Sequence, residues 1–133
     1  MVLRKKLLVL EDHPGLGQLL KDLFTAHGYE VTIATNGRQG LDYAQEGGFA
    51  IIITDIKMPE MDGIEFLRTL HEAKPKTENG PIIVYSNFAY QYSKDEVLSL
   101  GASEFVAKDT VSTTDLVQLV EKTISAHGQA STK

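Results

Sequence analysis

Three runs of consecutive apolar residues constrain the fold of this chain more than any other feature. They lie at residues 7–10, 50–53 and 82–85. A strand with one solvent-exposed face alternates apolar and polar residues, whereas a strand that is buried on both faces is apolar at nearly every position. Strands of the second kind belong in a parallel sheet with helices on both sides. The sequence therefore predicts an α/β fold.

Segments with helical spacing lie between these runs. Residues 16–24 carry leucine or phenylalanine at i, i+3, i+4, i+7 and i+8, which predicts an amphipathic helix. Asn36, Asp62 and Ser93 each precede a further helix and are typical N-cap residues, and Ser93 opens the spacing of a capping box. Residues 113–124 predict the last helix. Five helices are therefore expected.

Two further strands complete the pattern, at residues 30–34 and 104–107. Strands that alternate with helices imply right-handed β-α-β units and a doubly wound sheet. We expect a single domain over residues 1–126 with the flavodoxin-like strand order 2-1-3-4-5. The polar residues 127–133 are expected to form a disordered tail, and the polar connection 74–80 is expected to be mobile.

Composition excludes several classes of protein. The chain has 133 residues and a net charge of −5. Its overall electrostatic field therefore does not attract nucleic acid or an anionic membrane. It has no cysteine, which excludes a disulfide scaffold, a thiolate metal site and a cysteine nucleophile. Its apolar runs are too short to span a bilayer, and no signal peptide is recognisable. We expect a cytoplasmic protein.

Polar residues follow the predicted strands where ligands bind in open α/β sheets, beyond the carboxyl ends of the strands. Glu11 and Asp12 follow the first strand, Asp55 the third, Ser86 the fourth and Lys108 the fifth. These five side chains are expected to lie at one edge of the sheet. Lys108 starts two strands, or roughly 10 Å, from Asp55, a gap that only a long side chain can close.

The expected strand order makes the first and third strands neighbours, so Asp12 and Asp55 face each other. Two carboxylates at about 4 Å repel by on the order of 4 kcal/mol at an effective dielectric of 20, which a bound cation relieves. A set of carboxylate oxygens suits Mg²⁺ better than zinc. His13 stands beside this pair; it is either a further ligand or, more simply, the entry to the first helix.

Residues 55–63 are DIKMPEMDG, with an aspartate after a buried strand and Asp-Gly opening the next helix. Together with Glu11, Asp12, Ser86 and Lys108, this stretch resembles the response-regulator receiver domain of two-component signalling. The resemblance extends over residues 5–126. It implies a signalling switch that supports only its own phosphorylation and dephosphorylation, not an enzyme that acts on other substrates.

By this resemblance, Asp55 is the phosphoacceptor and takes a phosphoryl group from a phosphohistidine on a sensor histidine kinase or a histidine phosphotransfer protein. Asp12, Asp55 and the backbone carbonyl of Lys57 hold Mg²⁺, and Glu11 acts mostly through a metal-bound water. Lys108 pairs with a phosphoryl oxygen.

The resemblance also implies an output step. The hydroxyl of Ser86 moves toward the phosphoryl group, and Phe105 on the fifth strand turns inward; otherwise Phe105 is simply a half-buried strand residue. The surface of the fourth helix, fifth strand and fifth helix then binds a downstream protein target, or an output domain that is missing from this sequence. No direct contact with nucleic acid or membrane is expected.

Three positions depart from the family pattern. Asp109 follows Lys108 where the family usually has proline after a cis bond; a cis bond before another residue costs about 3–4 kcal/mol, so we predict a trans bond unless the surroundings hold it cis. Asn87 is larger than the usual alanine or glycine and narrows access to the phosphoryl group. We expect Lys57, Phe88 and Asn87 to set the lifetime of the acyl phosphate.

Three rival interpretations remain. A flavin- or dinucleotide-binding loop at residues 15–17 would need a third glycine where Leu20 stands. A phosphatase that forms an aspartyl phosphate would need an acid where Lys57 stands. A pseudo-receiver would share the fold but act as a phosphorylation-independent interaction module, and the atypical Asn87 and Asp109 favour it.

Overall fold

The computed structural model describes residues 4–87 and 91–131. In this part of the chain, five parallel strands form one sheet in the order β2-β1-β3-β4-β5, and five helices alternate with them. The predicted order 2-1-3-4-5 is confirmed. The strands are β1 (Lys5–Leu10), β2 (Tyr29–Ala34), β3 (Ile51–Thr54), β4 (Ile82–Ser86) and β5 (Glu104–Ala107), and the helices are α1 (Pro14–Ala26), α2 (Gly37–Glu46), α3 (Gly63–Glu72), α4 (Lys94–Ser99) and α5 (Thr113–Ser131).

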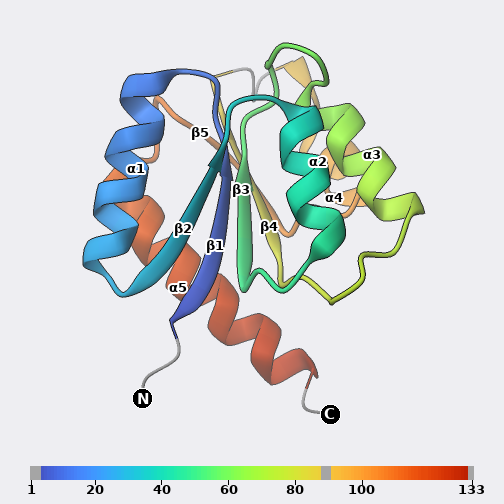
Figure 1. Cartoon of the computed structure of the whole chain (residues 1–133). Coiled ribbons are helices and arrows are strands. Elements are labelled where there is room, and N and C mark those ends of the chain that lie inside the picture. The colour runs from blue at the N-terminus through green and yellow to red at the C-terminus, as the bar shows by residue number, and fades with distance from the viewer. Residues whose placement is uncertain (1–3, 88–90, 132–133) are drawn as a thin grey trace.

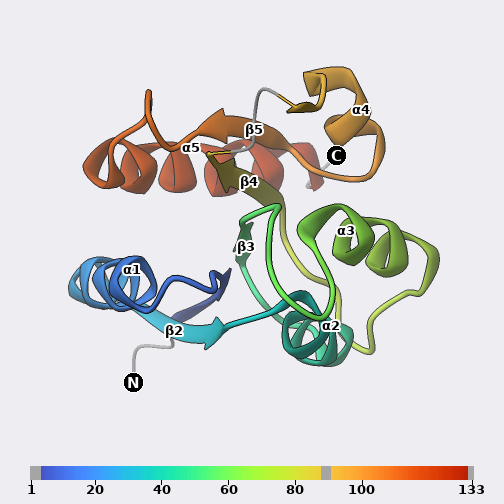
Figure 2. The same ribbon diagram turned by 90° about the horizontal axis from the view of Figure 1, so that it is seen from above.

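Helices cover both faces of the sheet, as Figures 1 and 2 show, with α1 and α5 on one face and α2, α3 and α4 on the other. Successive strand residues enter opposite cores: Leu7 and Val9 pack toward α1 and α5, while Leu8 and Leu10 pack toward α2 and α3. The strands are apolar at consecutive positions because both faces are buried. The doubly wound, flavodoxin-like fold is confirmed.

The register of the sheet brings the ends of the strands together. Leu10 of β1 pairs with Thr54 of β3, and Ser86 of β4 pairs with Ala107 of β5. The next residues along β1, β3 and β5 are Glu11, Asp55 and Lys108, so these three residues leave the sheet at the same edge.

The predicted caps start three helices. The side chains of Asn36 and Asp62 accept hydrogen bonds of 2.8 Å from backbone amides one turn into α2 and α3. Ser93 and Glu96 form the reciprocal capping box at the start of α4. These bonds satisfy amides that have no partner within the helix.

The connection between β3 and α3 contains a tight turn at Glu60. This residue has a φ of 70°, and the amide of Met61 donates to the carbonyl of Pro59 at 2.7 Å. A three-residue turn with positive φ is rare and strained for a residue other than glycine. The carbonyl of Met61 accepts from the amide of Gly37 at 2.9 Å, and a Cβ at Gly37 would lie 2.1 Å from that oxygen. The connection is thus bonded to the start of α2.

The last helix is longer than the sequence predicts. We expected a disordered tail from residue 127, but α5 continues to Ser131. The apolar spacing ends near Ile124, so the last turns carry no amphipathic signal. A helix that is already anchored adds a hydrogen bond with each residue and no new nucleation cost, which explains the extension. No helix in the described residues is long and apolar enough to cross a membrane.

The connection that we expected to be mobile, residues 74–80, is tied to the chain that joins α2 and β3. Thr77 forms a parallel β-bridge with Gly47, and the amide of Gly80 donates to the carbonyl of Phe49 at 2.7 Å. The side chain of Asn79 accepts from the amide of Phe49 at 3.2 Å and donates to the carbonyl of Ala44 at 2.9 Å. Its polar residues therefore serve as backbone partners, which composition does not reveal.

Candidate functional site

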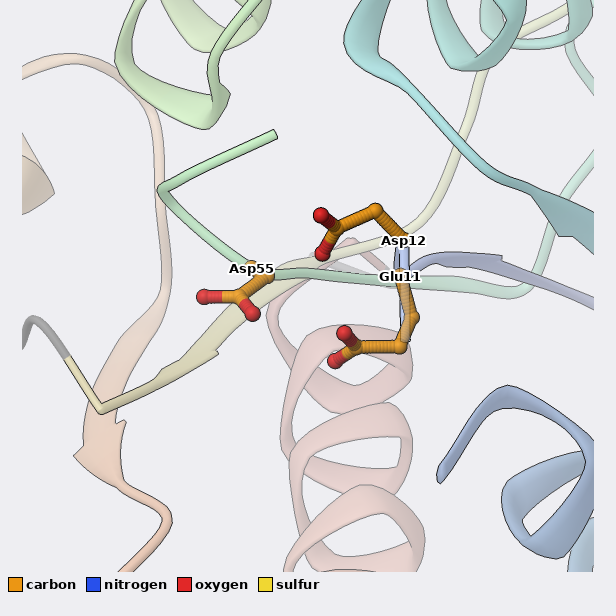
Figure 3. A group of neighbouring side chains, drawn as sticks. All are labelled: Glu11, Asp12 and Asp55. Atoms are coloured by element: carbon orange, nitrogen blue, oxygen red, sulfur yellow. The ribbon is translucent and has the colours of Figure 1, made fainter. Parts of the chain in front are cut away.

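Three carboxylates converge at the carboxyl edge of the sheet. Glu11 and Asp12 follow β1, and Asp55 follows β3, so two adjacent strands supply all three. One carboxylate oxygen of each residue lies within 4.8 Å of the others. Figure 3 shows the three side chains turned toward a common space. The expected juxtaposition of Asp12 and Asp55 is therefore present.

Backbone hydrogen bonds hold two of these carboxylates in place. Oδ1 of Asp55 accepts from the amide of Ile56 at 2.7 Å, and Oε2 of Glu11 accepts from the amide of His13 at 3.1 Å. Glu11 and Asp55 are buried, whereas Asp12 is exposed. The group thus combines two fixed acids with one that solvent reaches.

Lys108 closes the gap from β5. Its Nζ lies 2.7 Å from Oε1 of Glu11 and 2.7 Å from Oδ2 of Asp55, and its side chain is only 13% exposed. Its own amide donates to the carbonyl of Ser86 at 3.2 Å, which fixes the start of the side chain against β4. The long side chain thus crosses the distance that the sequence predicted.

Burial and neighbouring charges shift the pKa values of two of these groups, Glu11 and Lys108. Burial raises the pKa of the Glu11 carboxyl, and the hydrogen bond and charge of Lys108 oppose that rise. Burial alone would lower the pKa of the Lys108 ammonium, but Asp55 and Glu11 together outweigh it and raise the pKa. The lysine therefore stays charged between two acids, and Glu11 is a carboxylate that a nearby cation would stabilise.

The donor set fits a hard divalent cation. Three carboxylates against one ammonium leave the group with two negative charges. Oxygen ligands from a few carboxylates, with space for water, are the ligands that Mg²⁺ uses in proteins. The residues present therefore fit a magnesium ion.

An open cleft lies over these acids. Asn87 and Lys57, two of the residues expected to set the acyl-phosphate lifetime, contribute to its wall, and the third, Phe88, falls outside the described residues. Leu16, the first residue of the apolar spacing that predicts α1, is half-buried and lines the cleft as well. The lining residues are Glu11, Asp12, His13, Leu16, Asp55, Lys57, Asn87 and Lys108.

The other candidate residues occupy distinct places. Nδ1 of His13 accepts from the amide of Leu16 at 3.2 Å and so caps α1, which supports its structural interpretation. Ser86 is fully buried at the end of β4, and Phe105 is half-buried on β5, where it pairs with Val84 and packs on the core under α3 and α4. Among the described residues there is no cis peptide bond, so the bond after Lys108 is trans.

Sequence reasoning missed one residue beside this group. Tyr85 is buried in β4, next to Ser86, and its hydroxyl donates to the carbonyl of Val111 at 2.7 Å. In the sequence, Tyr85 belongs to an apolar run and carries no other signal. Only the folded chain brings its hydroxyl to the connection that follows Lys108.

Comparison with known proteins decides the family. The family model described as "Response regulator receiver domain" matches residues 7–121, which is most of the chain. The chain belongs to the response regulator receiver domain family. The resemblance stated from residues 55–63 and the strand ends is confirmed.

Curated relatives of this receiver domain include proteins of several lengths. The chemotaxis protein CheY of Thermotoga maritima is 36% identical over 105 residues, which cover 78% of this chain and 85% of the relative. The uncharacterized transcriptional regulatory protein YkoG of Bacillus subtilis is 33% identical over 102 residues, or 77% of this chain. The match spans only 43% of YkoG, and 45% of the transcriptional regulatory protein DltR of Streptococcus agalactiae.

Solved receiver domains share the fold. The receiver domain of the Francisella response regulator 1452 is 26% identical, with a TM-score of 0.80 over 92% of this chain and 98% of that chain. The receiver domain of the sensor histidine kinase PA1611 of Pseudomonas aeruginosa is 25% identical, with a TM-score of 0.78 over 92% of this chain and 99% of that one. That structure contains a magnesium ion coordinated in its active-site cleft.

Proposed function

We propose that this receiver domain is a phosphorylation switch whose phosphoacceptor is Asp55. The observation that carries the proposal is the arrangement around Asp55: two further carboxylates lie within 4.8 Å, and the Lys108 ammonium is bonded to its Oδ2. A nucleophilic carboxylate that is held beside a cation site and a fixed ammonium suits phosphoryl transfer, because catalysis of that reaction rests on positioning and charge neutralisation.

The proposed donor is a phosphohistidine on a sensor histidine kinase or a histidine phosphotransfer protein. A carboxylate oxygen of Asp55 forms a bond to phosphorus while the phosphorus–nitrogen bond to the imidazole breaks. The electron pair of that bond stays on the imidazole, which is protonated from solvent. The product on this chain is an acyl phosphate on Asp55. In this proposal the switch works in the cytoplasm and acts only on its own phosphoryl group.

The surrounding residues have separate roles in this proposal. Glu11, Asp12, Asp55 and the carbonyl of Lys57 would hold Mg²⁺, and the ion would neutralise charge on the transferred group. Lys108 exchanges one of its two carboxylate partners for a phosphoryl oxygen. Its raised pKa keeps it protonated for that contact.

The output step is proposed to run through the buried end of β4. Ser86 hydrogen-bonds the phosphoryl group once it is in place, and Phe105, half-buried one strand away, moves further inward. The surface of α4, β5 and α5 then binds a downstream protein or an attached output domain. Lys57, Asn87 and Phe88 are proposed to control how fast water removes the phosphoryl group; the first two line the cleft.

Intact mass after incubation with acetyl phosphate and Mg²⁺ tests the proposal. We expect the wild-type chain to gain one phosphoryl group, and the gain to disappear with a chelator or in Asp55→Asn. Asp42→Asn is the matched control, because Asp42 is an exposed acid on α2. A folded wild-type chain that gains no mass would favour the pseudo-receiver, which acts as an interaction module without phosphorylation.

A further inference from the structure

The buried phenol of Tyr85 joins two segments that are far apart in the chain. Tyr85 is 4% exposed, and its hydroxyl donates a 2.7 Å hydrogen bond to the carbonyl of Val111, 26 residues later. A buried tyrosine hydroxyl usually finds a partner, but that partner can be any nearby acceptor. Here the acceptor lies in the connection between β5 and α5, which begins at Lys108.

That connection is a compact turn. The amides of Thr110 and Val111 both donate to the carbonyl of Ala107, at 3.2 and 3.0 Å. The turn therefore carries Lys108 and Val111 as one unit. Strand β4 holds both ends of it: the carbonyl of Ser86 accepts from the amide of Lys108 at 3.2 Å, and the hydroxyl of Tyr85 donates to Val111.

The side chain of Lys108 depends on where this turn lies. It extends from the end of the edge strand β5 to acids that follow β3 and β1, and both of its bonds are 2.7 Å long. A long flexible side chain that is held at such a distance loses both bonds if its backbone origin moves, since neither acid can follow: Asp55 and Glu11 are themselves bonded to backbone amides.

The charges of Lys108 and Glu11 act on the phenol of Tyr85. Burial raises the pKa of Tyr85, the charge of Lys108 lowers it, and the charge of Glu11 raises it. The charges of both members of the pair therefore act on the phenol, and its hydrogen bond goes to the carbonyl of Val111.

We propose that Tyr85 is a positioning residue for Lys108: its hydroxyl bond to Val111 fixes the turn that aims the ammonium at Asp55. The consequence for phosphoryl transfer rests on the proposed function, whereas the consequence for Lys108 does not. A tyrosine that only fills the core would affect stability and leave the ammonium in place.

Tyr85→Phe tests the proposal because it removes the hydroxyl and keeps the ring. We expect a folded chain whose rate of phosphorylation by acetyl phosphate at saturating Mg²⁺ falls about tenfold. Nuclear magnetic resonance of the side-chain ammonium of Lys108, assigned by its loss in Lys108→Arg, is expected to show a changed nitrogen shift and faster exchange with water.

Tyr29→Phe is the matched control. Tyr29 is also buried, but it lies at the start of β2 and packs edge-to-face on Phe24. We expect this variant to retain the wild-type rate and the wild-type Lys108 signal. An equal change in both variants would overturn the proposal, and so would an unchanged Lys108 signal in Tyr85→Phe, whatever the rate.

The two proposals fail in different ways. If the wild-type chain is not phosphorylated but the Lys108 signal shifts in Tyr85→Phe alone, the positioning role of Tyr85 stands and the proposed function fails. If the wild-type chain is phosphorylated and Tyr85→Phe leaves the Lys108 signal unchanged, the proposed function stands and the positioning role fails.

Discussion

Lys108 acts as the counterion of its own acidic group. Its ammonium contacts Glu11 and Asp55 at 2.7 Å each, so it neutralises part of the charge that would otherwise attract a divalent cation. A cation that enters this group has to share the two carboxylates with the lysine. The lysine would therefore compete with a metal ion, whereas under the proposed function it would favour the bound phosphoryl group.

Replacing Lys108 is therefore expected to separate metal binding from phosphoryl transfer. In Lys108→Ala we expect Mg²⁺ to bind about fivefold more tightly, or by about 1 kcal/mol, because solvent in the open cleft screens most of the charge interaction. Phosphorylation of Asp55 is expected to slow at the same time. Titration calorimetry measures the first effect, and intact mass over time measures the second.

Lys76→Ala is the control for the change in net charge. Its ammonium pairs with Glu46 at 3.1 Å, and its side chain is 75% exposed. Lys76 precedes the amino end of β4, at the edge of the sheet opposite the acidic group. We expect this variant to bind Mg²⁺ as the wild-type chain does. Weaker binding of Mg²⁺ in Lys108→Ala would show that the lysine supports the metal site instead of competing with it.

At the level of elements, one side chain adds to the backbone bonds that hold the connection between α3 and β4. Asn79 bonds the amide of Phe49 through its oxygen and the carbonyl of Ala44 through its nitrogen. Both partners belong to the chain around the end of α2 and the start of β3. This amide group therefore links two connections at the edge of the sheet opposite the acidic group.

Asn79→Ala is expected to lower the free energy of unfolding by about 1–3 kcal/mol, because two backbone groups lose their partner. Asn79→Asp retains the acceptor but loses the donor and should lie between the alanine variant and wild type. Urea denaturation measures both. The control is Glu78→Ala: the neighbouring side chain is exposed, and only its backbone carbonyl bonds Gly48. A loss in Asn79→Ala no larger than in this control would contradict the prediction.

Elements with a local signal were predictable from the sequence. Apolar runs marked the buried strands, and Asp62 and Ser93 marked helix starts, because a capping bond joins residues three positions apart. The tether at Asn79 was not predictable, since its partners lie 30 and 35 residues away. The continuation of α5 to Ser131 was also missed, because the polar end of a helix carries no apolar spacing.

The candidate site also has one part that the sequence could predict and one part that it could not. Parallel topology alone places Glu11, Asp55 and Lys108 at one edge, so their convergence could be expected from the strand ends. Topology does not say which side chain pairs with which, because that depends on rotamers and on backbone turns across strands. The two hydrogen bonds of the Lys108 ammonium, to Glu11 and to Asp55, could therefore be seen only in the folded chain. The same holds for the hydrogen bond from the Tyr85 hydroxyl to the turn after Lys108.

For the whole molecule, the acidic group links strands of one cooperative sheet. Glu11 and Asp12 follow β1, and Asp55 follows β3. A binding site formed by all three exists only in the folded state. A ligand that binds only the folded state stabilises it by mass action, by about 2.7 kcal/mol at a hundred times its dissociation constant.

Mg²⁺ is therefore expected to raise the midpoint of thermal unfolding relative to a sample with chelator, by an amount that grows with its concentration. Asp12→Asn should weaken this dependence, since it removes an exposed ligand while leaving both buried acids. Asp42→Asn should keep it. If Asp12→Asn responds to Mg²⁺ as strongly as wild type, Asp12 is not a ligand.

The hydrogen bond between the amide of Gly37 and the carbonyl of Met61 joins the β3–α3 connection to α2. Lys57 lies near the start of the β3–α3 connection. Near its end, the carbonyl of Met61 accepts a hydrogen bond from the first amide of α2. If that connection shifts when an ion or a phosphoryl group arrives, α2 has to swing with it or release it. The Gly37 amide resonance would then serve as a distant reporter of events at Asp55, on a helix that contributes no ligand of its own.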